Sequence, residues 1–239
     1  MSLLAAIAFL TRIPIRYPFS TEQVARAAGW FPLVGGALGL LYGAVFLGAT
    51  HIAPAYVAAI LVLIVEALLT GALHYDGLAD MCDGFGGGRT REDVLRIMRD
   101  HAIGTYGATA LILMLLLTAS CLTALKAPLL AASWLCAGGA FGRWTILLLS
   151  RALPYARSHN AISTHIGRRE LIVGTATVAA TAFLLHWQTL IAAAVALTLA
   201  ALLGRLAHKK IGGITGDTLG ATAQITQTAL LLTGVILNR

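Results

Sequence analysis

The stretch IGTYGATALILMLLLTASCLTAL, residues 103–125, is predominantly apolar and contains no charged side chain. A helix of about 20 such residues crosses the roughly 30 Å hydrocarbon core of a bilayer. Segments of similar length and character recur at 28–50, 54–73, 128–150, 171–187, 189–207 and 218–237. They are too long and too continuously apolar for barrel strands, and backbone in lipid must satisfy its own hydrogen bonds. The sequence therefore predicts an all-α, polytopic membrane helical bundle with about seven transmembrane helices.

The composition supports a single integral membrane domain over residues 1–239. Hydrophobic residues make up 58% of the chain and charged residues only 11%, against about a quarter charged in soluble domains. The first ten residues, MSLLAAIAFL, are apolar but too short to span, and Arg12, Pro14 and Arg16 follow without a small-residue cleavage site. We therefore expect an interfacial or re-entrant N-terminal helix and not a signal peptide.

The basic residues predict an orientation for the bundle. Fourteen of the 17 lysines and arginines fall in the N-terminal segment or in the loops after the second, fourth and sixth predicted spans, whereas the opposite face has only Lys126 and Arg239. Positive charge is retained in the cytoplasm, so the N-terminus is expected there. This asymmetry explains the net charge of +7, so nucleic-acid binding is not needed to explain it. The expected partner of the basic residues is the lipid bilayer. All ten acidic residues also fall on or just inside this face, which topology does not explain.

The segment HYDGLADMCDG, residues 74–84, concentrates acidic side chains. Asp76, Asp80 and Asp83 follow the spacing i, i+4, i+7, which places them on one face of a helix. Their mutual repulsion is relieved by a divalent cation, and oxygen ligands favour Mg²⁺ or Mn²⁺ over zinc. The alternative is a solvated acidic loop. Glu66, inside the preceding apolar span, favours a functional site, because an intramembrane acid is costly.

A second acidic site lies in GGITGDTLGA, residues 212–221, where Asp217 opens the last predicted span. A plain helix N-cap is the competing explanation for Asp217. Two acidic patches that face one pocket suggest magnesium-dependent phosphate chemistry. The predicted metal ligands are Glu66, Asp76, Asp80, Asp83 and Asp217, and Asp76, Asp80 and Asp83 are also the predicted catalytic residues.

Arginines at the same face would bind phosphate oxygens, to which guanidinium groups are well matched. Each one taken singly is also explained by membrane topology. His74 adjoins the acidic cluster and is a candidate proton acceptor. Arg143, about two turns inside its span, needs an acid, a carbonyl or an anionic substrate as partner. The predicted substrate-binding residues are Arg12, His74, Arg99, Asp100, Arg151, Arg157 and Thr215.

Several motifs together resemble the cobalamin synthase family, the adenosylcobinamide-GDP ribazoletransferases. They occur in order over nearly the whole chain: FLTRIPI (9–15), FPLVGGALG (31–39), HYDGLADMCDG (74–84), RIMRDHAIGTYG (96–107), LPYAR (153–157) and GGITGDTLGA (212–221). The acidic motif and the TGD motif are the specific ones. Tyr75, where the family commonly has leucine, and His101, where serine is frequent, depart from the pattern without removing a carboxylate.

The resemblance implies a reaction in the last assembly stage of cobalamin. A hydroxyl of α-ribazole, or of its 5′-phosphate, would attack the phosphorus on the cobinamide side of adenosylcobinamide-GDP and release GMP. It also implies Mg²⁺ dependence and a bacterial or archaeal cell membrane, the inner membrane in a Gram-negative cell, with the active face in the cytoplasm. A second copy of the chain or other corrinoid-assembly enzymes are candidate partners.

Two other functions fit parts of the pattern. The first is a membrane phosphotransferase of the CDP-alcohol type, although Asp80 stands where that signature wants arginine. The second is an ion-coupled transporter, which would place its acids near mid-bilayer and often shows repeated halves. Here the acids gather at one face, and the chain has no evident internal repeat.

Overall fold

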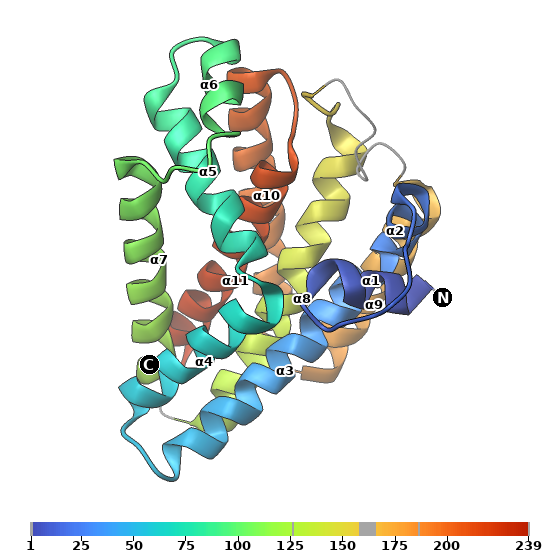
Figure 1. Ribbon diagram of the computed structural model, residues 1–239. Helices are drawn as coiled ribbons and strands as arrows, with labels where there is room; N and C mark the ends of the chain where they lie inside the picture. Colours follow the sequence, from blue (N-terminus) through green and yellow to red (C-terminus); the bar gives the residue numbers. More distant parts are fainter. Residues whose placement is uncertain (1, 126, 158–165, 186, 239) are drawn as a thin grey trace.

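The protein is a bundle of α-helices (Figure 1). The computed structural model describes residues 2–125, 127–157, 166–185 and 187–238. The helices are α1 (Ser2–Leu10), α2 (Thr21–Ala27), the 3-10 helix η1 (Ala28–Trp30), α3 (Phe31–Thr50), α4 (Ala55–Thr70), α5 (Leu73–Gly87), α6 (Arg91–Ile97), α7 (Thr105–Ala124), α8 (Pro128–Ala152), α9 (Arg168–Leu185), α10 (Thr189–Ile211) and α11 (Gly216–Leu237). Within the described ranges there is no strand, only an isolated bridge between Tyr155 and Ile214. The all-α prediction is confirmed.

Each of the seven predicted spans contains a described helix, but not every one of these helices is long and apolar enough to cross a bilayer. Four described helical stretches are long and apolar enough to cross a bilayer: Thr21–Thr50, α7, α10 and α11. A fifth results if α4 and α5, bent by 91°, are counted as one broken span. α8 is not among these candidate spans. It is buried along most of its length, so protein and not lipid surrounds it. The number of seven spans therefore remains a prediction. Lys126 and Arg239, the two basic residues predicted at the face opposite the cytoplasm, lie outside the described residues.

The centre of the bundle is α8, which packs against both α3 and α11. Small residues allow the α3 and α8 backbones to touch. A Cβ atom added at Gly35 would lie 2.2 Å from the Gly139 carbonyl oxygen, and one at Gly39 would lie 2.2 Å from that of Leu135. Close approach of this kind is the usual basis of helix association in membranes, where the hydrophobic effect gives no help.

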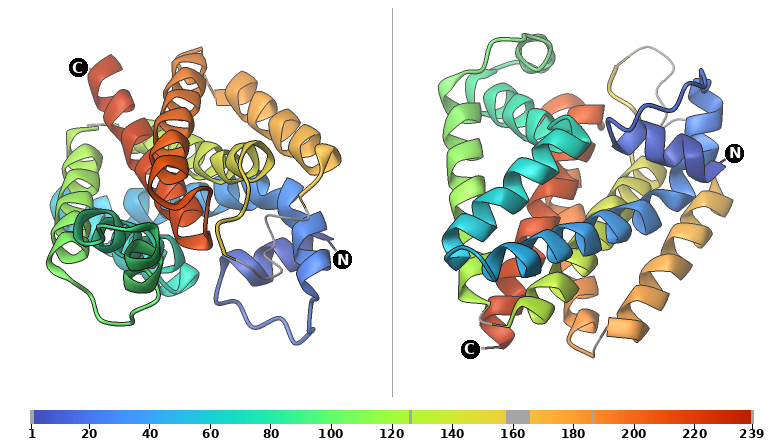
Figure 2. Two further views of the ribbon diagram at one scale, coloured as in Figure 1. Left: turned by 90° about the horizontal axis from the view of Figure 1, so that it is seen from above. Right: turned by 60° about the horizontal axis from the view of Figure 1, so that its bottom comes forward.

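The N-terminal helices gather at one side of the bundle, as Figure 2 shows. α1 has nine residues and buries Ala5, Ala6 and Leu10, while Leu3 and Leu4 remain exposed. It is too short to span, in agreement with the expected interfacial or re-entrant helix.

A sharp bend between α4 and α5 sets the direction of the acidic helix. Gly71 and Ala72 both have left-handed backbone conformations, with φ of 62° and 59°. This conformation costs a residue with a Cβ atom about 1–2 kcal/mol, so packing must hold Ala72 in place. The bend lets α5 lie between α7 and α11.

Candidate active site

The acidic helix α5 meets the beginning of α11. A Cβ atom added at Gly77 would lie 2.8 Å from the carbonyl oxygen of Asp217 and 3.1 Å from its Cα. Only a glycine allows the two backbones to come this close. The expected convergence of Asp217 on the 76–83 stretch is therefore present.

We expect Gly77→Ala to disturb this contact. The added methyl group meets backbone, which cannot rotate away, so the substitution should cost about 1–3 kcal/mol of stability and move Asp217 relative to Asp76. Thermal unfolding in detergent measures the cost. Gly48→Ala is the matched control, because a Cβ atom at Gly48 meets nothing within 4 Å. Equal melting temperatures for the two variants would contradict the assigned contact.

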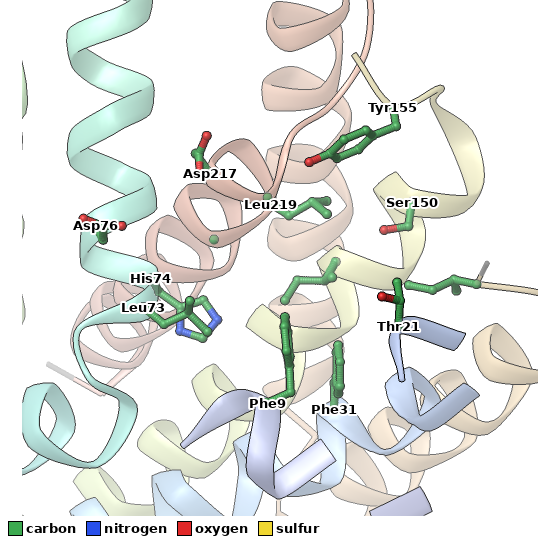
Figure 3. A pocket seen from close by; sticks show the side chains of 14 residues that line it. Phe9, Thr21, Phe31, Leu73, His74, Asp76, Ser150, Tyr155, Asp217 and Leu219 are labelled. Atoms are coloured by element: carbon green, nitrogen blue, oxygen red, sulfur yellow. The ribbon is translucent and has the colours of Figure 1, made fainter. Parts of the chain in front are cut away.

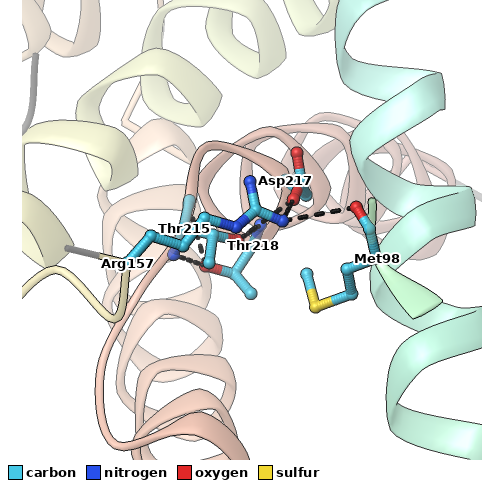
Figure 4. Close-up of polar contacts among 5 residues, drawn as sticks. All are labelled: Met98, Arg157, Thr215, Asp217 and Thr218. Carbon is cyan, nitrogen blue, oxygen red and sulfur yellow. Dashed lines mark hydrogen bonds and ion pairs between the residues drawn. The ribbon is translucent and has the colours of Figure 1, made fainter. Parts of the chain in front are cut away.

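Asp217 is not the cap of α11. Thr215 is the N-cap, and it forms a capping box with Thr218, in which each side chain binds the other's backbone N–H. Asp217 instead forms an ion pair with Arg157, whose Nη2 lies 2.7 Å from Oδ2, and accepts a 3.3 Å hydrogen bond from the Thr215 hydroxyl (Figure 4). The N-cap explanation of Asp217 is thus wrong. Thr215, predicted to bind substrate, is fully buried and has a structural role.

Arg157 reaches Asp217 because two loops pair beside the helix. The Ala156 N–H donates to the Ile214 carbonyl at 2.8 Å, and the Ile214 N–H donates to Pro154 at 2.9 Å. Arg91 at the start of α6 donates to the carbonyls of Ala156 and Ile211 and so ties both loops to α6. The guanidinium of Arg157 is thereby held at the entrance of α11.

Asp76 and Asp80 keep their carboxylates available. Asp76 is exposed and Asp80 is half-buried, and neither makes a hydrogen bond or an ion pair with any described residue. The charges of Asp76, Asp217, Arg157 and Asp83 all act on Asp80. Two free carboxylates beside a third, paired one form an electronegative surface that a cation or a phosphate-bound cation would stabilise.

Asp83 faces a different neighbour. Its two carboxylate oxygens accept hydrogen bonds from the backbone N–H groups of Gly104 and Gly107, at 2.7 and 2.8 Å. These amides belong to the first turn of α7, which has no side-chain cap of its own at Gly104. Asp83 thus stabilises the positive end of a helix, and the structure does not bring it to the Asp76 and Asp80 pair as a free ligand.

Asp83→Ala should therefore lower stability and not only activity. Loss of two charge-assisted hydrogen bonds is expected to cost about 1–3 kcal/mol and to loosen the start of α7. Hydrogen exchange of the amides in residues 104–108, compared with the rest of α7, measures this loosening. Unchanged exchange in the variant would refute the capping role.

Glu66 belongs to a buried polar network. Its carboxylate, in a residue only 2% exposed, accepts hydrogen bonds from the Tyr75 hydroxyl at 2.9 Å and from Gln227 Nε2 at 2.6 Å. Arg143 donates to the other end of the Gln227 amide and also lies 3.4 Å from His74 Nδ1. The structure therefore gives Glu66 interior partners in place of the predicted metal, and it supplies the partners that Arg143 was expected to need.

The contact with Arg143 sets the role of His74. A guanidinium only donates hydrogen bonds, so His74 Nδ1 accepts, and the neutral ring carries its proton on Nε2. In that form His74 offers a donor, not a proton acceptor, to anything beside it. His74 is 4% exposed and lines a cavity.

That cavity has a volume of about 410 Å³ and lies where α8 ends and α11 begins (Figure 3). Asp76 and Asp217 lie along one side, and the rings of Phe9 and Phe31 lie at the opposite end. The other lining residues are Thr21, Leu73, His74, Ile146, Ser150, Tyr155, Ile166, Gly216, Leu219 and Gly220. The sequence pattern did not reveal the aromatic wall, because Phe9 lies in α1 and resembles an ordinary lipid-facing residue.

The remaining predicted residues lie outside the acidic centre, which consists of Asp76, Asp80 and Asp217. Arg12 packs its side chain over Gly71 at the α4–α5 bend. Arg99 and Asp100 are exposed in the turn after α6, where Asp100 accepts a hydrogen bond from the Ala102 N–H. Arg151 is exposed and lines a second cavity. None of these four makes an ion pair with Asp76, Asp80 or Asp217 in the described structure.

The available carboxylates suit a hard cation such as Mg²⁺ whose remaining coordination positions are filled by water or substrate. Among the described residues, no three histidine, cysteine, aspartate or glutamate side chains gather into a complete metal site, so the predicted set of five ligands is not assembled. Asp76 and Asp80 have free oxygens and Asp217 is adjacent. Magnesium is commonly held by one or two carboxylates, with water and substrate phosphates completing the octahedron.

Comparisons with known proteins match one family over almost the whole chain. The family model for cobalamin-5-phosphate synthase matches residues 2–235. The adenosylcobinamide-GDP ribazoletransferase of Shewanella frigidimarina is 40% identical over 240 residues, which is 95% of this chain and 91% of the relative. The protein of the same name from Azorhizobium caulinodans is 40% identical over 250 residues, 98% of this chain and 94% of the relative. No solved structure matches significantly.

Proposed function

Because the chain belongs to the cobalamin-5-phosphate synthase family and is therefore a transferase of cobalamin synthesis, we propose that its substrates are adenosylcobinamide-GDP and α-ribazole or its 5′-phosphate. A ribose hydroxyl oxygen attacks the phosphorus attached to cobinamide. The bond from that phosphorus to the bridging oxygen breaks, and GMP leaves with the electron pair. The hydroxyl proton passes to a base, and the product is adenosylcobalamin or its 5′-phosphate.

The observation that carries this proposal is the meeting of α5 and α11 beside one cavity. Two carboxylates without described partners, Asp76 and Asp80, lie near the Asp217–Arg157 pair, and Asp76 and Asp217 line the cavity. Phosphoryl transfer requires positioning and charge neutralisation more than covalent chemistry. An acidic centre for a cation beside a guanidinium for phosphate oxygens is suited to both.

Asp76 and Asp80 would hold Mg²⁺, with water and substrate phosphates as its other ligands, and Asp217 would add negative charge beside it. A bound Mg²⁺, for which Mn²⁺ is a substitute, would neutralise the charge that develops on the leaving phosphate. Arg157 would orient phosphate oxygens from the Asp217 side. His74 would donate from Nε2 to a substrate oxygen, which leaves an aspartate as the acceptor of the hydroxyl proton.

The chain is a membrane protein with several apolar helices. We propose that it lies in the bacterial or archaeal cell membrane, the inner membrane in a Gram-negative cell, with the cavity open to the cytoplasm. The positive-inside rule assigns to the cytoplasm the end of the bundle where α8 ends and α11 begins, and water-soluble nucleotide substrates would reach it there.

A single assay tests the function. Purified protein in detergent micelles is incubated with adenosylcobinamide-GDP, α-ribazole and Mg²⁺, and GMP is measured. We expect GMP release that requires both substrates and that stops when EDTA is added. No GMP from folded protein would contradict the proposal. Ion-dependent uptake into sealed vesicles, without any turnover in micelles, would identify the transporter instead.

A further inference from the structure

The cavity described above has two chemically different ends. Phe9 of α1, which is 37% exposed, stacks on the buried ring of Phe31 of α3 with centroids 5.3 Å apart and an interplanar angle of 9°. Leu73, Ile146 and Leu219 extend this apolar surface, and Thr21 and Ser150 also line the cavity. At the other end lie Asp76 and Asp217 (Figure 3). A ligand that fills the cavity must therefore be apolar and flat at one end and polar at the other.

The apolar end favours a particular kind of base. Guanine carries several hydrogen-bond donors and acceptors on its edges, and burial without partners costs free energy for each of them. A benzimidazole has no such exocyclic groups, and it gains from contact with aromatic and aliphatic side chains. Stacked phenylalanine rings beside aliphatic residues thus suit a benzimidazole nucleoside better than a guanosine.

The size of the cavity points the same way. Its volume of about 410 Å³ is near the lower end of the range for sites that enclose a drug-sized molecule, about 300–1,000 Å³. One nucleoside fits such a space. A corrinoid ring with its side chains and an attached nucleotide does not, and must approach from outside the cavity.

An adjoining cavity has a different character. It has a volume of about 380 Å³ and shares Ser150, Tyr155 and Ile166 with the first, and its walls add Arg151 and Arg168. Cationic walls suit phosphates. The acidic centre and the two cavities together offer separate places for an apolar nucleoside and for a phosphate-bearing substrate.

We propose that the cavity between Phe9, Phe31 and Asp76 is the ribazole subsite, with the benzimidazole base of α-ribazole against the ring of Phe9 and the ribose toward Asp76 and Asp217. This inference rests on the proposed function and adds the substrate that this cavity takes. It brings a ribose hydroxyl beside the aspartates, and it leaves the nucleotide-bearing corrinoid to enter from the side of Arg151.

Two opposite changes test the subsite. Leu73→Trp fills the cavity from a residue that is 38% exposed, and Phe9→Leu removes the exposed aromatic ring. The matched controls are Leu68→Trp on α4 and Phe183→Leu on α9, at residues that are 71% and 90% exposed. For each variant we would measure thermal unfolding, KM for each substrate, and equilibrium binding of α-ribazole to the purified protein without the corrinoid.

We expect both subsite variants to raise KM for α-ribazole about tenfold or more, the scale on which apolar pockets discriminate, and to weaken its direct binding equally. KM for adenosylcobinamide-GDP should stay within about twofold of wild type, and both controls should behave as wild type. If KM for adenosylcobinamide-GDP rises instead, or if neither constant changes in folded variants, the subsite assignment is wrong. A wild-type protein that releases no GMP would overturn the proposed function itself, so the two failures are distinguishable.

Discussion

Asp80→Asn is expected to lower kcat by about 100- to 1,000-fold, the loss typical of removing one preorganised electrostatic group from an active site. Asp80 is half-buried on α5, and Asp76, Asp217 and Arg157 are close enough for their charges to act on it. An amide is nearly isosteric with the carboxylate but is uncharged, so it would weaken cation binding without opening a hole in the helix packing.

The control for Asp80→Asn is Asp93→Asn on α6. That side chain is 44% exposed and lies 3.8 Å from Arg96 in a surface ion pair, which contributes little to stability. The rate of GMP release and the amount of folded protein in the membrane should be measured for both variants. Turnover by Asp80→Asn at the level of Asp93→Asn would exclude Asp80 from the reaction.

Arg143→Met is expected to cost about 3–5 kcal/mol of stability, because it leaves a buried carboxylate without its countercharge. Arg143 is 1% exposed and Glu66 is 2% exposed, and Gln227 connects them by hydrogen bonds to both. Thermal or denaturant unfolding in detergent would report the loss as a lower midpoint.

The double variant Glu66→Gln, Arg143→Met separates a charge effect from a packing effect. If the two charges compensate one another, the double variant should lose less stability than the sum of the two single variants. Arg205→Met, at an exposed residue of α10, is the control for loss of an arginine. Simple additivity of the two single costs would show that Glu66 and Arg143 are not coupled.

Much of the fold could be predicted because long apolar segments have few alternatives in a membrane. The helical nature of every predicted span followed from this, and the i, i+4, i+7 spacing correctly indicated a helix for Asp76, Asp80 and Asp83. The number of spans did not follow with the same reliability. Apolar composition does not show how much of a helix faces lipid, because α11 is apolar enough to span although 67% of its apolar window is buried.

Which acidic residues belong to the site was harder to predict, because acidic residues at one face of a bundle can cap helices or join buried hydrogen-bond networks as well as bind a cation. Asp83 binds the amides of Gly104 and Gly107, a partnership that depends on the packing of α5 against α7. Glu66 is satisfied by Gln227 and Tyr75. Gln224 and Gln227 in the last apolar span are the signal in the sequence for a buried polar network.

Capping also excludes the competing explanation of Asp217 at the start of α11. A Thr-x-x-Thr pattern, Thr215 to Thr218, forms the reciprocal cap, in the manner of the usual Ser or Thr with Glu or Gln three residues later. This pattern identifies Thr215 as the cap, so Asp217 is a carboxylate that the helix end does not need.

Binding of Mn²⁺, measured by electron paramagnetic resonance on purified protein in detergent with and without adenosylcobinamide-GDP, tests most directly whether the carboxylates at the meeting of α5 and α11 attract one cation. We expect a bound Mn²⁺ signal that strengthens with the substrate, that is lost in Asp80→Asn and that is weakened in Asp217→Asn, while Asp93→Asn retains it. Wild-type binding in both the Asp80 and the Asp217 variants would contradict this expectation.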